Sequence, residues 1–429
     1  MLTTHEELRC KPVVLDGLWG WCHARSTNRC DRPTAMRILC VHQGYELYGS
    51  DRAFVESVAA IREAWPAAEI TAVLPCDGPI VAPLASVATH VAFDPIWVLR
   101  RRGLAKLATL GPFRLAPALW RAITRMRSTD LVYINTIVIA DYLLAARFFP
   151  EKSLVHVHEI PTGIAARLLR RLLVWTRAEV IFNSQATKRA FALPASVPQH
   201  VVYNGIADPP AVARFDYDGA RPLRLLLIGR INRTKGQDLL IEALALLPPD
   251  IRARLAVRIV GGSFDNDLAR EDALKRQARA AGLAATVRFE PFQDDPACYY
   301  AWADIVVMPS RLPESLGRVA IEAMAYGRPV IAAAIGGLPE VVQDGITGRL
   351  VPPNDAAALA GAIAQAATGP STWRGYAAAA RVRYEAEFTR RAIDRQIQAV
   401  VRARLARRAD ALSAPYLSLI HISEPTRPY

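Results

Sequence analysis

Long apolar runs and cysteine are scarce in this 429-residue sequence, and acidic residues are fewer than basic ones. No stretch comes close to 18 uninterrupted apolar residues, so a bilayer-spanning helix is not expected. Six cysteines in a chain of this length do not suggest a disulfide framework, which favours a reducing compartment. Glu6 and Glu7 precede any apolar run, which is not the order of a secretory signal. We therefore expect a cytoplasmic protein.

The composition points to large folded cores. The chain is 52% hydrophobic and 22% charged, which excludes a disordered or collagen-like protein. At roughly 150 residues per domain, the length predicts two or three domains. The net charge of +13 favours anionic partners: nucleic acid, acidic lipid surfaces or phosphorylated small molecules.

Both ends look foreign to the fold. Residues 1–35 show no helical or strand period, and Met36 is the natural start, so we expect an upstream non-native extension there. A zinc site could be imagined in this segment, but the spacings match no common zinc motif; the residues concerned are His5, Cys10, Cys22, His23 and Cys30. Residues 417–429 resemble a translated sequencing adapter and are excluded from the fold.

Strands and helices alternate from Met36 onward, in two series. Near-continuous apolar runs separated by helical segments predict parallel, doubly wound sheets. The first series, over 36–205, has expected strands at 37–41, 70–74, 89–93, 131–134, 154–157 and 180–182. A Pro-, Asp- and Gly-rich segment at 207–219 is a plausible hinge.

The second series, over 206–371, has expected strands at 224–228, 256–260, 287–289, 305–308, 330–333 and 348–351. An Ala- and Arg-rich helical segment, assigned to 372–416, follows it. Ligands of such sheets bind beyond the carboxyl ends of the strands, so a cleft between two α/β domains is the expected site.

A glycine- and cation-bearing turn runs from Gly229 to Gly236, between a strand and a helix. Glycine lets the backbone approach a ligand closely, and a helix N-terminus favours anions. Arg230 and Lys235 add two positive charges, which could absorb the charge of a diphosphate leaving group without Mg²⁺. An ordinary turn with solvated basic residues explains this segment equally well when it is taken alone.

Two carboxylates flank the start of a predicted helix over 318–326. Glu314 and Glu322 are eight positions apart, at most about 12 Å along a helix. A glycosidase pair would be about 5–9.5 Å apart. The spacing instead suits two ends of a long ligand, one at a sugar and one at a ribose.

The order of these motifs resembles that of the glycosyltransferase family 4 group of retaining enzymes. That group has the GT-B fold, in which two Rossmann-like, doubly wound domains face a central cleft. The resemblance covers about residues 36–405 and is most specific in the second series. It rests on Gly229-Arg230, Lys235-Gly236, Glu314, Glu322-Ala323, Gly327-x-Pro329, Gly336-Gly337-x-Pro339-Glu340 and Asp344-Gly345, with Gly49-Ser50-Asp51, Asp77-Gly78-Pro79 and Tyr203-Asn204-Gly205 in the first.

The resemblance implies a role for each matching residue. Arg230 and Lys235, after Gly229, would hold the donor diphosphate, and Glu314 would contact the hydroxyls of the transferred sugar. Further implied contacts are the backbone N–H groups of Leu316 and Gly317 near the sugar, Glu322 at the ribose, Gly49 at the diphosphate and His158 at the sugar. The donor would be a UDP- or GDP-sugar, with no other cofactor.

Two segments depart from the pattern or compete with it. Pro291 stands where the family usually has glycine, which leaves the nucleotide base open. Asp265-Asn266-Asp267 imitates a metal-binding Asp-x-Asp, but it follows two glycines in a polar loop, and we assign no metal.

Two basic, tryptophan-bearing segments in the first series suggest a membrane surface as partner. Arg100 to Arg127 holds eight basic and no acidic residues, and Arg167 to Trp175 has a similar character. Basic amphipathic helices of this kind lie on anionic membranes. We therefore expect peripheral docking on the cytoplasmic leaflet and a lipid-linked or polysaccharide acceptor in cell-envelope glycan synthesis. A solvated arginine face remains the alternative.

Other functions stay open at this point. Charge alone would allow nucleic-acid binding, but we find no zinc finger, basic heptad or RNP-type sequence, and we expect no nucleic-acid partner. A non-enzymatic binder of anionic surfaces and a nucleotide-sugar epimerase with the same fold are the remaining alternatives.

Overall fold

A computed structural model describes residues 35–413, apart from 48, 100–103, 213, 263–267 and 294. Within that range, the side chains of 104–114, 268 and 410–413 are also outside the description. The two chain ends, the cysteine–histidine set near the N-terminus and Asp265-Asn266-Asp267 therefore lie outside the described residues. Two compact units divide the chain between Ser153 and Leu154.

Seven strands form the first sheet, in the order β3-β2-β1-β4-β5-β6-β7. Strand β1 pairs in parallel with both β2 and β4. Strands β2 and β3 therefore lie on one side of β1 and strands β4 to β7 on the other, so the strand order reverses between β1 and β4. All residues of β4 and β5 are buried, as expected for strands covered on both faces. The strands are β1 (Arg37–His42), β2 (Glu69–Leu74), β3 (His90–Phe93), β4 (Leu131–Asn135), β5 (Ser153–Val157), β6 (Glu179–Phe182) and β7 (Gln199–Val201).

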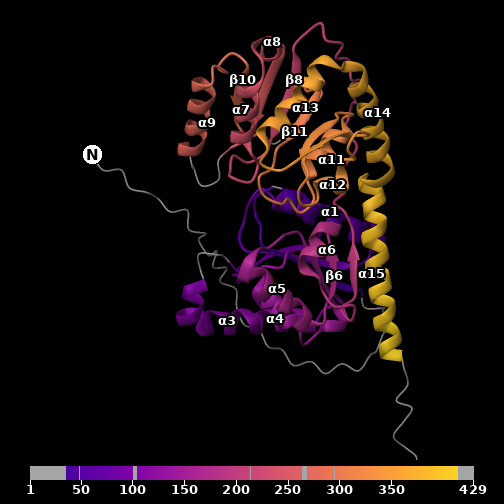
Figure 1. Cartoon of the computed structure of the whole chain (residues 1–429). Helices are drawn as coiled ribbons and strands as arrows, with labels where there is room; N and C mark the ends of the chain where they lie inside the picture. Colours follow the sequence, from indigo (N-terminus) through magenta and orange to yellow (C-terminus); the bar gives the residue numbers. More distant parts are fainter. Residues whose placement is uncertain are drawn as a thin grey trace, which may run out of the picture. The chain divides into compact units, whose positions relative to one another are not determined.

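Helices alternate with these strands (Figure 1). They are α1 (Gly49–Ala64), α2 (Val81–Ala85), α3 (Leu104–Arg127), α4 (Ala140–Ala146), α5 (Gly163–Thr176) and α6 (Gln185–Phe191). Helix α6 begins with a side-chain cap, in which the Ser184 hydroxyl accepts the N–H of Thr187.

Six parallel strands form the second sheet, in the order β10-β9-β8-β11-β12-β13. Here the reversal lies between β8 and β11. The strands are β8 (Leu223–Ile228), β9 (Leu255–Val260), β10 (Val287–Glu290), β11 (Ile305–Met308), β12 (Val330–Ala333) and β13 (Gly348–Val351). The helices are α7 (Gln237–Leu246), α8 (Pro249–Arg252), α9 (Leu268–Ala280), α10 (Ala297–Trp302), α11 (Arg318–Ala325), α12 (Leu338–Val341) and α13 (Ala356–Thr368).

Both faces of the second sheet are covered by apolar packing. Leu225 and Leu227 of β8 point into one cluster, which includes residues of α7 and α13. Leu226, between them, points into the other, which includes residues of α11. Because alternate residues of the strand face opposite apolar layers, the sequence shows continuous apolar runs here.

Two long helices end the described chain, α14 (Pro370–Glu387) and α15 (Arg390–Ser413). Between them the backbone pairs with the segment after β7, because Ile206 N–H donates to Phe388 O (3.0 Å) and Arg390 N–H to Ile206 O (2.9 Å). A Cβ on Gly205 would lie 2.9 Å from Arg390 Cα, which accounts for a glycine at this position.

A buried ion cluster fixes α15 to β6. The carboxylate of Glu179 is fully buried and receives Arg407 at 2.6 Å, Arg404 at 3.3 Å and His200 at 2.6 Å. Burial alone would raise the pKa of Glu179, but the hydrogen bonds from His200 and Arg407 and the nearby guanidinium charges outweigh it and lower that pKa.

The predicted α/β class with two doubly wound sheets is confirmed. The strands at 305–308, 330–333 and 348–351 have the predicted bounds, and most others differ by a residue or two. The apolar pair Val201-Val202 predicts the last strand of the first series, whereas the structure has β7 at Gln199–Val201, with Gln199 and His200 only half-buried. The C-terminal helical segment consists of two helices. Among the described residues, no helix is both long and apolar enough to span a bilayer.

Candidate active site

The reversal point of the second sheet carries most of the predicted donor residues. Residues 229–236 follow β8, and residues 309–317 follow β11, the neighbouring strand. In an open parallel sheet, chains leaving two such strands diverge to opposite faces and leave a crevice at their carboxyl ends. The topology therefore brings together two motifs that are about 80 residues apart in the sequence.

The turn after β8 is held by its own side chains. Asn232 Oδ1 accepts the N–H groups of Thr234 (2.9 Å) and Lys235 (3.1 Å). Gln237 Nε2 donates to the carbonyl of Arg230 (2.9 Å), which ties the turn to the start of α7. These bonds fix the backbone around Arg230 and Lys235, the two cations that are predicted to bind the donor diphosphate.

The same turn packs tightly on the segment after β11. Gly236 has φ +70°, and a Cβ there would lie 1.9 Å from Pro309 O. The N–H of Arg311 donates to Thr234 O at 2.8 Å. Only glycine satisfies both the backbone angle and the contact at 236.

Lys235 and Glu314 meet directly. Lys235 Nζ lies 2.9 Å from Glu314 Oε2, and the hydroxyl of Ser310 donates to the other carboxylate oxygen. Both charged groups are mostly buried, the Glu314 side chain being 11% exposed. The predicted cation and carboxylate thus form one polar centre at the crevice.

Gly336 and Gly337 support the Glu314 backbone from a neighbouring loop. The N–H of Gly337 donates to Glu314 O at 2.8 Å, and a Cβ on Gly336 would lie 2.3 Å from the same oxygen. The glycine pair in the sequence motif is therefore explained by close backbone packing behind Glu314.

Glu322 lies in α11, the helix that follows Glu314, and both of its carboxylate oxygens accept hydrogen bonds. Arg318 Nε donates to Oε1 (3.0 Å) and the hydroxyl of Tyr300 to Oε2 (2.6 Å). Burial, followed by the charge of Glu322, raises the pKa of Tyr300, so this phenol stays a donor. Leu316 is buried, and Gly317, at φ +95°, precedes the first residue of α11.

Gly49 and His158, which are also predicted site residues, belong to segments that follow strands β1 and β5 of the first sheet. Gly49 is exposed at the first residue of α1. His158 follows β5, is 8% exposed, and its ring centroid lies 4.0 Å from that of His156. Burial lowers the pKa of His156 to about 3, so this neighbour is neutral at physiological pH.

A buried histidine network at the reversal point of the first sheet was not predicted. His42, the last residue of β1, contacts Asp51 Oδ1 through Nε2 (2.7 Å) and Asn135 Nδ2 through Nδ1 (2.9 Å). Its ring stacks on Phe54 at 4.8 Å between centroids. Asp51 belongs to the motif that begins at Gly49, but no local pattern links it to this network, because Asn135 lies 93 positions from His42 in the sequence. The network anchors the loop that leads to Gly49.

These two doubly wound parallel sheets, with a polar centre at the reversal point of the second, define the GT-B class of glycosyltransferase folds. Residues 219–383 match the family model described as glycosyl transferases group 1. Lys235, Glu314 and Glu322 all lie within the residues that this family model matches.

Similar sequences and structures agree with this assignment. The D-inositol 3-phosphate glycosyltransferase of Streptomyces coelicolor is 45% identical over 150 residues, which are 34% of this chain and 33% of that protein. The one of Frankia alni is 43% identical over 38% of this chain and 41% of its own. The chain thus spans about a third of the length of the first of these relatives.

Solved structures match a much larger share of this chain than these related sequences do. Anabaena Alr3699/HepE in complex with UDP and glucose superposes with a TM-score of 0.70 and 26% identity, covering 89% of this chain and 100% of its own. The sucrose-phosphate synthase of Thermosynechococcus elongatus, at 22% identity, has a TM-score of 0.68 over 88% of this chain and 100% of its own. The second likeness concerns the fold alone.

Proposed function

We propose that this protein is a retaining glycosyltransferase that moves a sugar from a nucleoside-diphosphate sugar to a lipid-linked or polysaccharide acceptor in cell-envelope glycan synthesis. The observation that carries the proposal is the Lys235–Glu314 contact at the reversal point of the second sheet. A mostly buried cation beside a carboxylate suits a ligand with an anionic diphosphate next to a sugar.

In this proposal, Lys235 and Arg230 absorb the negative charge of the departing nucleoside diphosphate, without a metal ion. Glu314 accepts hydrogen bonds from the hydroxyls of the transferred sugar, and Ser310 fixes its orientation. The backbone N–H groups of Leu316 and Gly317 lie beside the sugar. The acceptor hydroxyl attacks the face from which the diphosphate leaves, through an oxocarbenium-like transition state. The roles of Glu322 at the ribose, Gly49 at the diphosphate and His158 at the sugar stay predictions.

UDP-sugars are the favoured donors, since Alr3699/HepE was solved with UDP and with UDP-glucose. The curated relatives support a second acceptor candidate, because their names specify D-inositol 3-phosphate. A phosphate-bearing polyol is therefore tested beside the lipid-linked acceptor.

Product analysis by NMR tests this function. We expect the protein, in EDTA, to transfer sugar from one of a panel of UDP- and GDP-sugars to a prenyl-diphosphate-linked saccharide, and the product to keep the donor's anomeric configuration. Inositol 3-phosphate serves as the second acceptor. Inverted product, or an epimerised nucleotide sugar formed without acceptor, would contradict the proposal.

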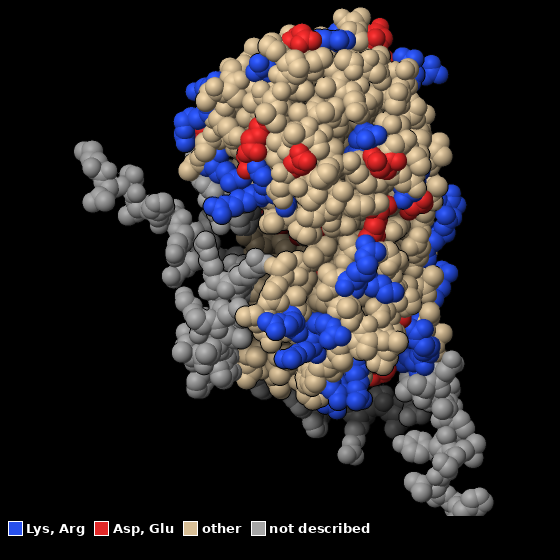
Figure 2. Space-filling view, in the orientation of Figure 1, with Lys and Arg blue, Asp and Glu red and all other residues tan. Residues whose placement is uncertain are grey.

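We also propose peripheral docking on an anionic membrane, through α5. The apolar Ile164, Leu168 and Trp175 are 68%, 51% and 47% exposed. They share a helix with the exposed Arg167 and Arg171. Figure 2 shows basic side chains gathered where Figure 1 places α5. Apolar side chains beside guanidinium groups suit the boundary between acyl chains and anionic headgroups.

Liposome co-sedimentation tests this docking. The double variant Leu168→Ala/Trp175→Ala is expected to bind anionic vesicles at least about tenfold more weakly at low salt, since two interfacial anchors are lost. Leu246→Ala, which removes an exposed leucine of α7, is the matched control and should bind like the wild type. Equal binding by the double variant and the control, or no binding by the wild type, would refute docking through α5.

A further inference from the structure

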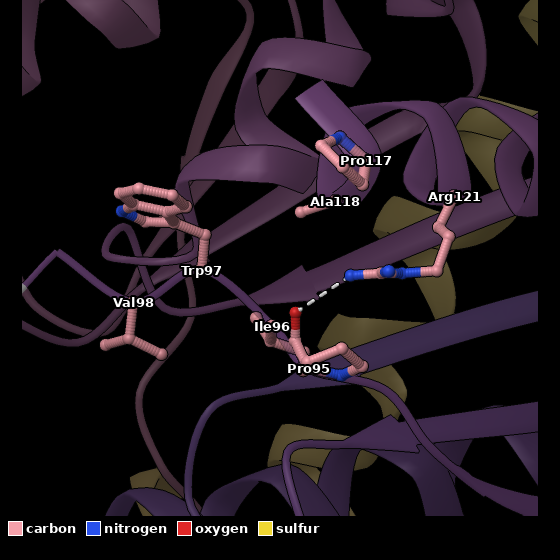
Figure 3. Close-up of a pocket in the computed structure, with 7 residues that line it drawn as sticks. All are labelled: Pro95, Ile96, Trp97, Val98, Pro117, Ala118 and Arg121. Atoms are coloured by element: carbon pink, nitrogen blue, oxygen red, sulfur yellow. Dashed lines mark hydrogen bonds between the residues drawn. The ribbon is translucent and has the colours of Figure 1, made fainter. Parts of the chain in front are cut away.

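A cavity of about 580 Å³ lies in the first unit, at the carboxyl edge of its sheet. One wall is the loop that follows β3, and the other is the second half of α3. In Figure 3 the Trp97 ring and the Arg121 guanidinium lie at opposite ends, with Pro117 and Ala118 between them on the helix. The lining residues are Pro95, Ile96, Trp97, Val98, Pro117, Ala118 and Arg121.

The loop wall is firmly anchored. Asp94, directly after β3, receives Arg125 of α3 through two bonds, at 2.6 and 2.9 Å. The segment Trp97–Leu99 pairs with the chain after β4: Ala140 N–H donates to Trp97 O (2.9 Å), and Leu99 N–H to Val138 O (2.8 Å). The cavity is therefore formed before any ligand arrives, which lowers the entropic cost of binding.

Asp141 adds a third anchor from α4. Its carboxylate accepts the N–H groups of Trp97 (3.3 Å) and Tyr142 (3.0 Å). Burial raises the pKa of Asp141 to about 6, and these N–H groups hold it lower than burial alone would. The backbone of Trp97 is thus held by bonds outside the cavity.

Among the described residues that line the cavity, Arg121 is the only charged one. Its guanidinium donates to Pro95 O at 3.3 Å and, among the described residues, forms no direct salt bridge; the charge of Arg121 also lowers the pKa of the nearby Asp141. Arg125, one turn later, is by contrast paired directly with Asp94. A guanidinium without a direct salt bridge beside apolar side chains suits an anion that carries an apolar group.

We propose that this cavity binds the phosphate-proximal part of a lipid-linked acceptor: a phosphate pairs with Arg121, and the first hydrocarbon units lie against Trp97, Ile96 and Pro117. This inference rests on the proposed function and names the acceptor class. The location agrees with it, because ligands of doubly wound sheets bind beyond the carboxyl ends of the strands.

The lining favours a lipid phosphate over a polyol phosphate. A polyol needs several hydrogen-bonding side chains around it, whereas in the described part of the lining only Trp97 and Arg121 have side chains that can donate. The neighbouring Trp120 is 68% exposed on the same helix. Such a tryptophan suits the membrane interface from which a lipid acceptor would enter.

Calorimetric titration of the full-length protein tests the proposal, with farnesyl phosphate below its micelle concentration as the probe. Arg121→Gln removes the charge and Ala118→Phe fills the cavity, and each is expected to weaken binding at least about tenfold. Arg127→Gln, an exposed arginine of α3 outside the cavity, is the matched control and should bind like the wild type. Farnesol, inorganic phosphate and inositol 3-phosphate should each bind at least tenfold more weakly than farnesyl phosphate.

Each other outcome counts against the inference. Equal binding by the wild type and Arg121→Gln would mean adsorption elsewhere, and inositol 3-phosphate binding as tightly as farnesyl phosphate would mean a polyol site. UDP and GDP titrated into the same samples separate the two proposals. Binding of either nucleotide without farnesyl phosphate binding overturns the acceptor cavity alone, whereas farnesyl phosphate binding without binding of either nucleotide overturns the proposed function instead.

Discussion

Replacing Lys235 with alanine is expected to lower kcat at least about 100-fold, the scale of losing one preorganised electrostatic stabiliser. The ammonium group is mostly buried and lies 2.9 Å from Glu314, so its charge acts where water screens little. Its loss also leaves the Glu314 carboxylate uncompensated beside the donor diphosphate, which should raise the donor KM. Glu314→Ala is expected to lower kcat by a similar factor.

Two further variants make this test specific. Lys275→Ala breaks another lysine–glutamate pair, with Glu271 on α9 at 2.6 Å, and should leave kcat unchanged. The double variant Lys235→Ala/Glu314→Ala should lose less than the product of the two single losses, because the residues act as one unit. Near-wild-type kcat in both single variants would end their assignment.

Gly236→Ala is expected to damage both the fold and donor binding. A Cβ at 236 would lie 1.9 Å from Pro309 O, and the backbone is at φ +70°. Backbone cannot yield as the tip of a side chain can, so the turn carrying Arg230 and Lys235 must move away from the segment after β11. We expect a loss of about 3 kcal/mol in the free energy of unfolding and a donor KM raised at least tenfold.

Gly282→Ala separates backbone strain from the clash. Gly282 has φ +69°, but nothing lies within 4 Å of a Cβ there. We expect this variant to lose about 1 kcal/mol, measured by urea unfolding, and to keep its donor KM. If both variants lost the same stability and kept the same KM, the close packing of the turn would have no part in donor binding.

The sequence predicted most strands because buried parallel strands are apolar on both faces, as in Ile305–Met308 and Val330–Ala333. The edge strand β7 has no such signal, and its position was missed. The order of the sequence motifs identified both Lys235 and Glu314 as candidate site residues. Their contact depends on β8 and β11 being neighbours, which no local pattern encodes.

Other parts of the molecule could not be predicted because they join distant segments. The His42–Asn135 bond and the Glu179–Arg407 pair each link residues far apart in the chain. No sequence motif marks the cavity beside Trp97, since the described residues of its lining are apolar apart from Arg121. Such sites follow from tertiary packing and not from sequence periodicity.

Several of the arginines that give the chain its positive net charge are bound to groups within the fold. Arg125 is matched by Asp94, and Arg170 donates to the carbonyls of Phe191 and Ala192. Arg328 is buried among the backbone carbonyls of Tyr300 and Ala301. Burial lowers the pKa of Arg328. Membrane attraction therefore depends on the exposed arginines of particular helices, above all α5, rather than on the total charge.

Calorimetric titration with UDP in EDTA tests the central claim most directly, which is that cations of the turn after β8 hold a nucleoside diphosphate without a metal ion. We expect the wild type to bind UDP, Lys235→Ala and Arg230→Ala to bind it at least about tenfold more weakly, and all three to bind uridine equally. UDP binding that needs Mg²⁺, or that is unchanged in both variants, would contradict the account.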